Sequence, residues 1–312
     1  MKKILFALFA VASLASCSNN EVIELNREQI GFGEAFVDNA TKADYSVGKT
    51  LDEFQVWGTL TGAGNTVQIF GGDDVYSTKD GVTKEFGQVW FCDNIQYWVP
   101  SADYNFVAIA DATAVACNAT TPLLPETIDF TVTDGDGDLL YAEATAVTDE
   151  TGTPSVSLVG FTFEHLLSKF FFEVTPPTLS ADYSFKVTDI KMSGVVKNGQ
   201  YSVAEEKWDA VGSEPETLTL DFHDGTQYFS HQIIPVKQWP TVYVDYEIYY
   251  KGTLVYEGHK FGGLVNGVSS SFTPEANHAY KVAVVVSSTN EISFTVNNVG
   301  GFEDGGSTTP VQ

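Results

Sequence analysis

The chain has 312 residues and a formal net charge of −25, from 16 basic and 41 acidic side chains. A surface this acidic repels phosphate backbones and anionic lipid headgroups, which argues against nucleic acid as a partner. The length is enough for one large or two ordinary domains, and we expect two.

The first residues have the pattern of a bacterial lipoprotein signal peptide. Two lysines form a basic start, an apolar stretch runs from Ile4 to Leu14, and two small residues precede Cys17. The apolar stretch is too short to span a bilayer as a stable helix. Residues 14–17, Leu-Ala-Ser-Cys, resemble the lipobox, in which the cysteine becomes the lipidated first residue of the mature chain. We predict a signal peptide over residues 1–16 and lipidation of Cys17, with an ordinary signal peptide and a chance cysteine as the alternative.

A strand-like segment follows the predicted lipid anchor. In EQIGFGEAFVDNATKA, Ile30, Phe32 and Phe36 lie on one face of an extended chain. Glu34 interrupts that face, which predicts a β-bulge or a change of register in this strand.

Two basic residues flank this first strand and are candidate sites of proteolytic cleavage. Arg27, the one arginine of the sequence, precedes it, and Lys42 follows it in NATKADYS. A cut at Arg27 frees the chain from its anchor and leaves the strand in place, whereas a cut at Lys42 removes the strand. The segment around Lys42 is polar and has small residues on both sides, which favours nicking. For both residues, a role as solvated tether residues stays open as the alternative.

The rest of the chain is typical of an antiparallel all-β protein. Short runs of β-branched and aromatic residues are separated by Gly, Asn, Asp and Pro, and helical periodicity is nearly absent. Residues 241–250, TVYVDYEIYY, alternate cleanly and predict a half-buried strand, with KGTLVYEG as its hairpin partner. EISFTVNNV places Ile292, Phe294 and Val296 on one face. It predicts the last strand, before a glycine-rich tail over residues 300–312.

The middle of the chain, VSLVGFTFEHLLSKFFFEVTPP, stays apolar over an unusual length. We predict a strand, a short helical turn from Glu164 to Ser168, and a second strand there. The polar segment VTDETGTPS that precedes it predicts a domain junction near Thr153 to Ser157.

One acidic segment has part of the spacing of a calcium loop. Asp134, Asp136 and Asp138 match the first three ligand positions, but the sixth and twelfth positions hold Leu139 and Thr145 in place of glycine and glutamate. A turn between strands is therefore the preferred interpretation, with weak calcium binding as the alternative. No nucleophile motif or paired zinc-binding spacing is present, so we expect no enzyme activity, no metal site and no cofactor.

Other chemically versatile residues have structural interpretations. We expect the five histidines to be solvated or singly hydrogen-bonded. Cys92 and Cys117 leave open two states, free buried thiols or a single disulfide. Five aromatic residues leave open a sugar-binding platform, although packing between sheets is the preferred interpretation. They are Trp57, Trp90, Tyr97, Trp98 and Tyr104.

Seven segments resemble, in order, those of the fimbrillin-like lipoproteins of Bacteroidales, the type V pilins and their anchor and tip relatives. They are the lipobox, LDEFQVWGTL, FCDNIQYWVPSADYNFVAIAD, DLLYAEA, FTFEHLLSKFFFEV, IIP at 233–235, and FTPEANHAYKVAVVV. The resemblance extends from Cys17 to about Val299. It implies two tandem transthyretin-like β-sandwiches, transport to the outer membrane as a lipoprotein, and a trypsin-like protease that removes the first strand. It also implies that an extended strand of another subunit fills the groove left behind.

These observations predict a division of the chain and a function. The predicted parts are a signal peptide (1–16), a lipid-anchored tether with a removable first strand (17–42), an N-terminal β-sandwich (43–155), a C-terminal β-sandwich (156–289), and a candidate donor strand with its tail (290–312). The expected function is a structural or accessory subunit of a surface fimbria, assembled by strand addition to other fimbrial subunits and used in adhesion. The alternative is a monomeric outer-membrane lipoprotein that binds glycan.

Overall fold

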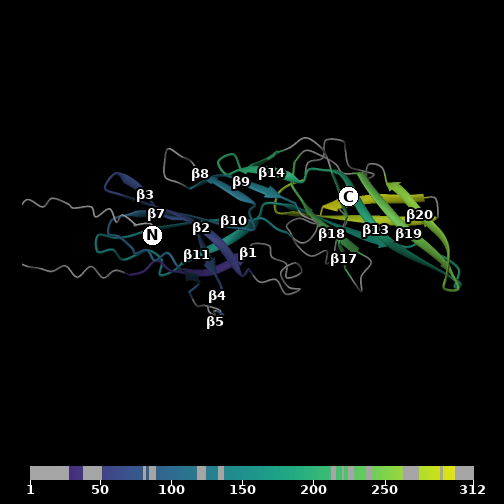
Figure 1. Ribbon diagram of the computed structural model, residues 1–312, viewed down its shortest axis with the longest axis horizontal. Coiled ribbons are helices and arrows are strands. Elements are labelled where there is room, and N and C mark those ends of the chain that lie inside the picture. The colour runs from purple at the N-terminus through teal and green to yellow at the C-terminus, as the bar shows by residue number, and fades with distance from the viewer. Residues whose placement is uncertain are drawn as a thin grey trace, which may run out of the picture.

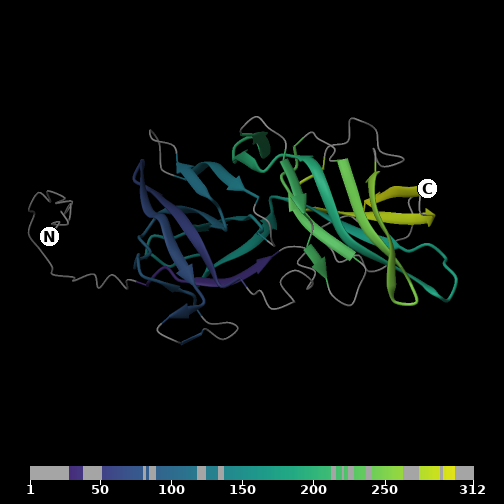
Figure 2. The ribbon, with the colours of Figure 1, turned by 45° about the vertical axis from the view of Figure 1, so that its right-hand side comes forward.

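The computed structural model is built from β-strands, and no helix occurs among the residues that it describes. These residues are 28–37, 51–79, 82–83, 89–117, 124–132, 137–211, 216–219, 221–223, 228–236, 241–262, 274–288 and 291–298. The all-β class predicted from the sequence is confirmed. The molecule is elongated, with strands of the first half of the chain toward one end and strands of the second half toward the other (Figure 1, Figure 2).

The first half of the chain is built on a seven-stranded sheet. In sheet order its strands are β1 (Phe32–Val37), β11 (Val159–His165), β10 (Leu140–Val147), β7 (Asp103–Ala110), β2 (Glu53–Gly62), β3 (Asn65–Tyr76) and β6 (Phe91–Cys92). All neighbours in this sheet are antiparallel except β1 and β11, which run parallel. Because β1 is an edge strand, its place in the sheet depends on β11 alone among the named strands.

A four-stranded sheet joins the two halves of the chain. Its strands, in order, are β15 (Lys207–Ala210), β14 (Asn198–Ser202), β9 (Pro125–Thr131) and β8 (Ala114–Cys117). Since β8 and β9 precede β11 in the chain and β14 and β15 follow it, the two halves share this sheet. A separate two-stranded ribbon is formed by β4 (Thr78–Lys79) and β5 (Val82–Thr83).

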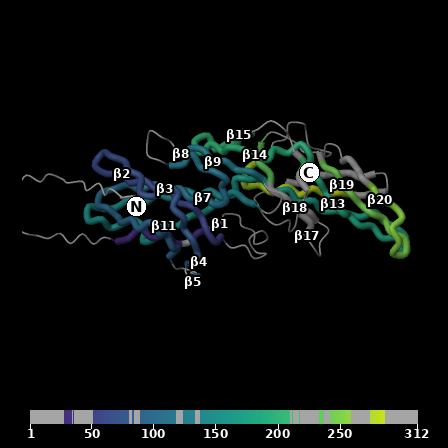
Figure 3. The backbone as a smooth tube through the Cα atoms, viewed as in Figure 1, coloured from purple at the N-terminus to yellow at the C-terminus, as the bar shows by residue number. Residues whose placement is uncertain are grey.

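Two further sheets form the second half, and Figure 3 shows β13, β19 and β20 together at its far end. The five-stranded sheet contains, in order, β17 (Asp221–His223), β18 (Tyr228–Ile233), β12 (Ser168–Thr175), β21 (His278–Ser288) and β22 (Glu291–Asn298). The four-stranded sheet contains β16 (Glu216–Thr219), β13 (Tyr183–Val195), β19 (Thr241–Tyr250) and β20 (Thr253–Gly262). β12 and β21 pair in parallel, and the other pairs are antiparallel.

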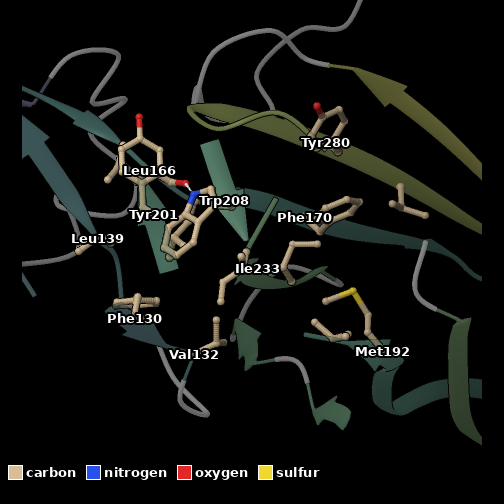
Figure 4. Close-up of a cluster of buried hydrophobic side chains, with 14 of the residues drawn as sticks. Phe130, Val132, Leu139, Leu166, Phe170, Met192, Tyr201, Trp208, Ile233 and Tyr280 are labelled. Atoms are coloured by element: carbon tan, nitrogen blue, oxygen red, sulfur yellow. Dashed lines mark hydrogen bonds between the residues drawn. The ribbon is translucent and has the colours of Figure 1, made fainter. Parts of the chain in front are cut away.

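Two clusters of buried side chains cover the opposite faces of the seven-stranded sheet. Along β7, Phe106 and Ala108 belong to an aromatic-rich cluster, whereas Val107 and Ile109 belong to the other. Successive residues of a strand point to opposite faces, so this central strand is buried on both sides. The cluster that contains Val107 and Ile109 continues through the shared four-stranded sheet into the second half of the chain (Figure 4). The two halves therefore have one continuous core between them.

Most strand predictions from the sequence are confirmed. In β19, Val242, Val244 and Tyr246 are at most 1% exposed, as the alternating pattern predicts. β20 pairs with β19 as its hairpin partner, and the last predicted strand is β22. The pairing of β1 with β11 shifts register between Phe32 and Ala35, which confirms the irregularity predicted around Glu34.

The helical turn predicted from Glu164 to Ser168 is wrong. β11 ends at His165, β12 begins at Ser168, and only Leu166 and Leu167 lie between them. Both leucines are buried, and the Leu166 carbonyl accepts a hydrogen bond of 2.7 Å from the Trp208 indole (Figure 4). The run of apolar residues therefore corresponds to two strands of different sheets and the buried two-residue connection between them. The predicted junction near Thr153 to Ser157 falls in the segment between β10 and β11, before this change of sheet.

Candidate functional site

The first strand, by which we mean β1 together with residues 28–31 before it, is held by main-chain hydrogen bonds on two sides. On one side, the Val159 amide of β11 donates to the Gly31 carbonyl over 2.8 Å. On the other, the Trp90 and Trp98 amides donate to the carbonyls of Phe32 and Glu28 over 2.9 and 3.0 Å. The Ile30 amide donates to the Gln96 carbonyl over 2.8 Å, and Gln29 pairs antiparallel with Tyr97. We call the residues that contact 28–33 in this way the β1 site.

The β1 site also has an apolar interior that receives two side chains of the strand. Ile30 is 3% exposed and Phe32 is 1% exposed. The ring of Phe32 lies edge-on to that of Phe70 at 5.3 Å between centroids and stacks on that of Phe161 at 6.0 Å. Full burial of one such side chain is worth about 1.5–3 kcal/mol, and each favourable ring pair adds about 0.5–1.5 kcal/mol. The first strand therefore contributes substantially to the core of the first half.

Glycines in the first strand allow Leu158 to pack closely against it. A Cβ atom at Gly31 would lie 2.9 Å from Leu158 Cδ2 and 3.2 Å from Val89 Cγ1, and one at Gly33 would lie 2.9 Å from Leu158 Cβ. Real Cβ atoms almost never come this close to another heavy atom, so a side chain at either position requires Leu158 to shift. The β1 site therefore accepts large apolar groups on one face of the strand and little or nothing on the other.

Removal of the first strand would leave this site open. The amides of Trp90, Trp98 and Val159 would lose their acceptors, and the carbonyl of Gln96 would lose its donor. Unpaired main-chain groups beside exposed apolar surface are a template for pairing with another strand. The arrangement thus has the properties of a peptide-binding edge that its own first strand covers.

The sequence-predicted site residues fall in three groups. Ile30 and Phe32 lie together in the β1 site, and Phe36 belongs to β1, where it pairs with Thr162. Ile292, Phe294 and Val296 lie on β22, whose backbone pairs antiparallel with β21 at the edge of the five-stranded sheet. The signal peptide, Cys17, Arg27, Lys42 and the tail after residue 298 lie outside the described residues.

The sequence analysis missed a buried hydrogen bond between a histidine and an aspartate. His165 and Asp138 are 2% and 4% exposed, and His165 Nδ1 lies 2.5 Å from Asp138 Oδ2. The available signal was the alternation of Phe161, Phe163 and His165, which places the histidine on the buried face of β11. Asp138, the last acidic residue of the calcium-like segment, thus has an interior partner, and Asp134 and Asp136 lie outside the described residues.

Four of the five aromatic candidates for a sugar platform are in the core. Trp57, Trp90, Trp98 and Tyr104 are 5%, 6%, 3% and 1% exposed, which confirms the preferred interpretation for them. Tyr97, at 45% exposed, is the exception.

The two cysteines of the described chain are free thiols. Cys92 and Cys117 are both half-buried, and burial raises the pKa of each. Within the part of the chain that the structure covers, no cluster of His, Cys, Asp and Glu side chains could hold a metal ion. The same part contains no helix that is long and apolar enough to cross a membrane.

Comparisons find the same fold in solved bacterial proteins at low identity. A candidate cell adhesion protein from Bacteroides uniformis matches with a TM-score of 0.56 and 15% identity, over 88% of this chain and 98% of that one. A fimbrial protein from Bacteroides vulgatus matches with a TM-score of 0.56 and 16% identity, over 88% and 99% of the two chains. No curated protein matches the sequence. A family profile described as fimbrillin-like matches residues 41–298.

Proposed function

Since the chain belongs to the fimbrillin-like family, we propose that it is a structural or accessory subunit of a surface fimbria and serves in adhesion. The solved proteins that share its fold include one described as a fimbrial protein and one described as a candidate cell adhesion protein. We also propose that its sheets correspond to two tandem transthyretin-like sandwiches. The sequence supports export as a lipoprotein that is held at the outer membrane through Cys17.

The mechanism of assembly that we propose is strand exchange at the β1 site. A trypsin-like protease cuts after Lys42 and releases the first strand, and an extended strand of a second subunit takes its place. The observation that carries this proposal is the two-sided pairing of residues 28–33 with the apolar burial of Ile30 and Phe32. Main-chain pairing supplies affinity in such strand addition, and pockets for alternate side chains supply specificity.

The structure argues against most of the sugar-binding platform on which the glycan-binding alternative depends. It required exposed aromatic rings, and four of its five candidate rings pack in the core. The chemistry of the β1 site also requires no catalytic group, because its donors and acceptors are main-chain atoms.

Limited trypsin treatment of the purified, unlipidated protein tests the proposal. We expect polymers that resist dissociation in detergent and appear as a ladder of subunit multiples, while untreated protein stays monomeric. A matched sample on a glycan array serves as the comparison. Saturable glycan binding by a protein that never forms polymers would contradict the fimbrial proposal.

A further inference from the structure

The seven-stranded sheet and the shared four-stranded sheet meet at a group of tyrosines and glutamates. In the seven-stranded sheet, Tyr141 of β10 lies directly opposite Glu164 of β11, and Glu143 lies two residues further along β10. Opposite residues of paired strands and alternate residues of one strand point to the same face, so these three side chains lie together. Both glutamates are exposed, whereas Tyr141 is half-buried and packs against the core cluster that contains Val107.

The shared sheet brings a second tyrosine against the first. Tyr201 of β14 lies opposite Trp208 of β15, with 5.5 Å between their ring centroids. The ring of Tyr201 also lies 6.4 Å from that of Tyr141, so the two sheets are in contact at this point. Glu206 lies in the turn between β14 and β15, where it has a positive φ of 50° and is exposed.

The hydroxyl of Tyr201 makes no hydrogen bond within the described part of the chain, although the residue is only 7% exposed. Figure 4 shows this hydroxyl pointing away from Trp208. Burial, and then the charges of Glu206, Glu164 and Glu143, raise the pKa of Tyr201 to about 12. At neutral pH the phenol is therefore uncharged, and its oxygen can accept a hydrogen bond from a ligand.

The three carboxylates around this hydroxyl have no basic partner. Among the residues that the structure describes, no lysine or histidine forms an ion pair with Glu143, Glu164 or Glu206. Glu205 differs from its neighbour Glu206, because its carboxylate lies 2.5 Å from Lys207 Nζ. Unpaired like charges repel one another, so a cation between the three carboxylates would be stabilised.

The aromatic rings indicate what kind of cation fits. Calcium and magnesium require six or more oxygen ligands, whereas an organic ammonium group is attracted by the faces of aromatic rings as well as by carboxylates. The half-buried ring of Tyr141 offers apolar surface for an alkyl chain, and its hydroxyl donates a hydrogen bond to Glu143, which orients that carboxylate.

We propose that this group of residues binds an organic ammonium group, supplied by a lysine side chain of a partner protein. We call it the ammonium site, and its residues are Tyr141, Glu143, Glu164, Tyr201, Glu206 and Trp208. The ammonium group lies between the carboxylates and donates a hydrogen bond to the Tyr201 hydroxyl. A partner rich in lysine matches the net charge of −25, because the acidic surface attracts basic proteins.

This inference does not depend on the strand exchange proposed above. Tyr141, Tyr201 and Trp208 belong to or pack against one of the two core clusters, whereas Ile30 and Phe32 of the first strand belong to the other. The ammonium site and the interior of the β1 site therefore lie on opposite faces of the seven-stranded sheet.

Titration of the full unlipidated chain with butylammonium chloride tests the proposal, with the NMR signal of the Trp208 indole N–H as the readout. We expect a saturable shift with butylammonium and none with butanol, which has the same alkyl chain without the charge. A blocked peptide of four lysines should bind at least as tightly. Binding of butylammonium without binding of the peptide would overturn the assignment to lysine side chains. An equal shift with calcium chloride, or none with butylammonium, would overturn the site.

Glu206→Gln and Glu205→Gln form a matched pair, because each removes one negative charge from the same turn. We expect Glu206→Gln to weaken binding of butylammonium about two- to fivefold. Glu205→Gln should leave binding unchanged, since Glu205 is already paired with Lys207. Equal weakening by the two substitutions would show a diffuse attraction to an acidic surface and would overturn the proposal.

Tyr201→Phe isolates the contribution of the hydroxyl. The ring stays in place and no hydrogen bond within the described chain is lost, so the variant should keep its melting temperature. Its affinity for butylammonium should fall about two- to tenfold, as expected for the loss of one hydrogen bond. A folded variant with full affinity would overturn the role of Tyr201 in the site.

Discussion

Asp138 and His165 share a hydrogen bond of 2.5 Å in the interior, although they lie 27 positions apart in the sequence. Asp138 stands just before β10, and His165 is the last residue of β11. These strands pair with Leu140 opposite His165, so the carboxylate reaches the imidazole across the end of the ladder. The contact fixes the point where the chain leaves the seven-stranded sheet for the five-stranded one. A buried polar pair at such a point stabilises the fold only while both partners are present.

Asp138→Ala should therefore lower the free energy of unfolding by about 1–3 kcal/mol, because it leaves the buried Nδ1 of His165 without this acceptor. Chemical denaturation monitored by tryptophan fluorescence measures the change. Asp103→Ala, at an exposed position on β7, is the control and should change stability by less than about 0.5 kcal/mol. Equal free energies of unfolding for the two variants would show that the Asp138–His165 hydrogen bond does not stabilise the fold.

Phe32→Ala should destabilise the uncleaved protein by about 3–5 kcal/mol, because it opens a cavity among the rings of the β1 site. The same denaturation assay applies. The control is Val67→Ala on β3, where the side chain is 50% exposed and little burial is lost. A loss no larger than that of the control would mean that the first strand is not an integral part of the core.

Cys17→Ser should give a protein that is still secreted but is no longer held at the membrane. Acyl chains supply about 0.8 kcal/mol of membrane affinity per buried CH₂ group, and the substitution removes their attachment site. Cell fractionation and incorporation of labelled fatty acid are the measurements. A wild-type protein that incorporates no fatty acid would remove the lipoprotein assignment.

Lys42→Gln should block polymer formation, whereas Arg27→Gln should leave it intact. A cut after Lys42 removes the first strand, but a cut after Arg27 leaves residues 28–37 in the β1 site. N-terminal sequencing of mature protein and gel analysis of polymers follow both events. Normal polymers from Lys42→Gln, with a mature chain that starts at Glu28, would contradict activation at Lys42.

The sequence predicts local pairing well and long-range pairing poorly. The hairpin of β19 and β20 follows from strict alternation and a two-residue turn, where Lys251 and Gly252 have positive φ angles of 48° and 80°. The pairing of β9 with β14 brings Ile128 opposite Tyr201 and has no local signal, because either strand could pair with many others.

In the β1 site, too, the local features could be predicted from the sequence and the long-range contacts could not. The apolar face of Ile30 and Phe32 and the irregularity after it were visible in the sequence. The second side of the β1 site was not, because residues 90–98 contain little regular strand and contact the first strand through isolated hydrogen bonds. The close contact of Leu158 with Gly31 and Gly33 likewise depends on the parallel pairing of β1 with β11, which alternation alone does not reveal.

Amide hydrogen exchange at the β1 site tests the central claim most directly. The amides of Trp90, Trp98 and Val159 donate to the first strand, and their exchange can be followed in the uncleaved monomer, in the monomer cut after Lys42, and in the polymer. The strand-exchange account predicts slow exchange in the uncleaved monomer, fast exchange after the cut, and slow exchange again in the polymer. Amides that stay protected in the cut monomer, or that stay unprotected in the polymer, would contradict it.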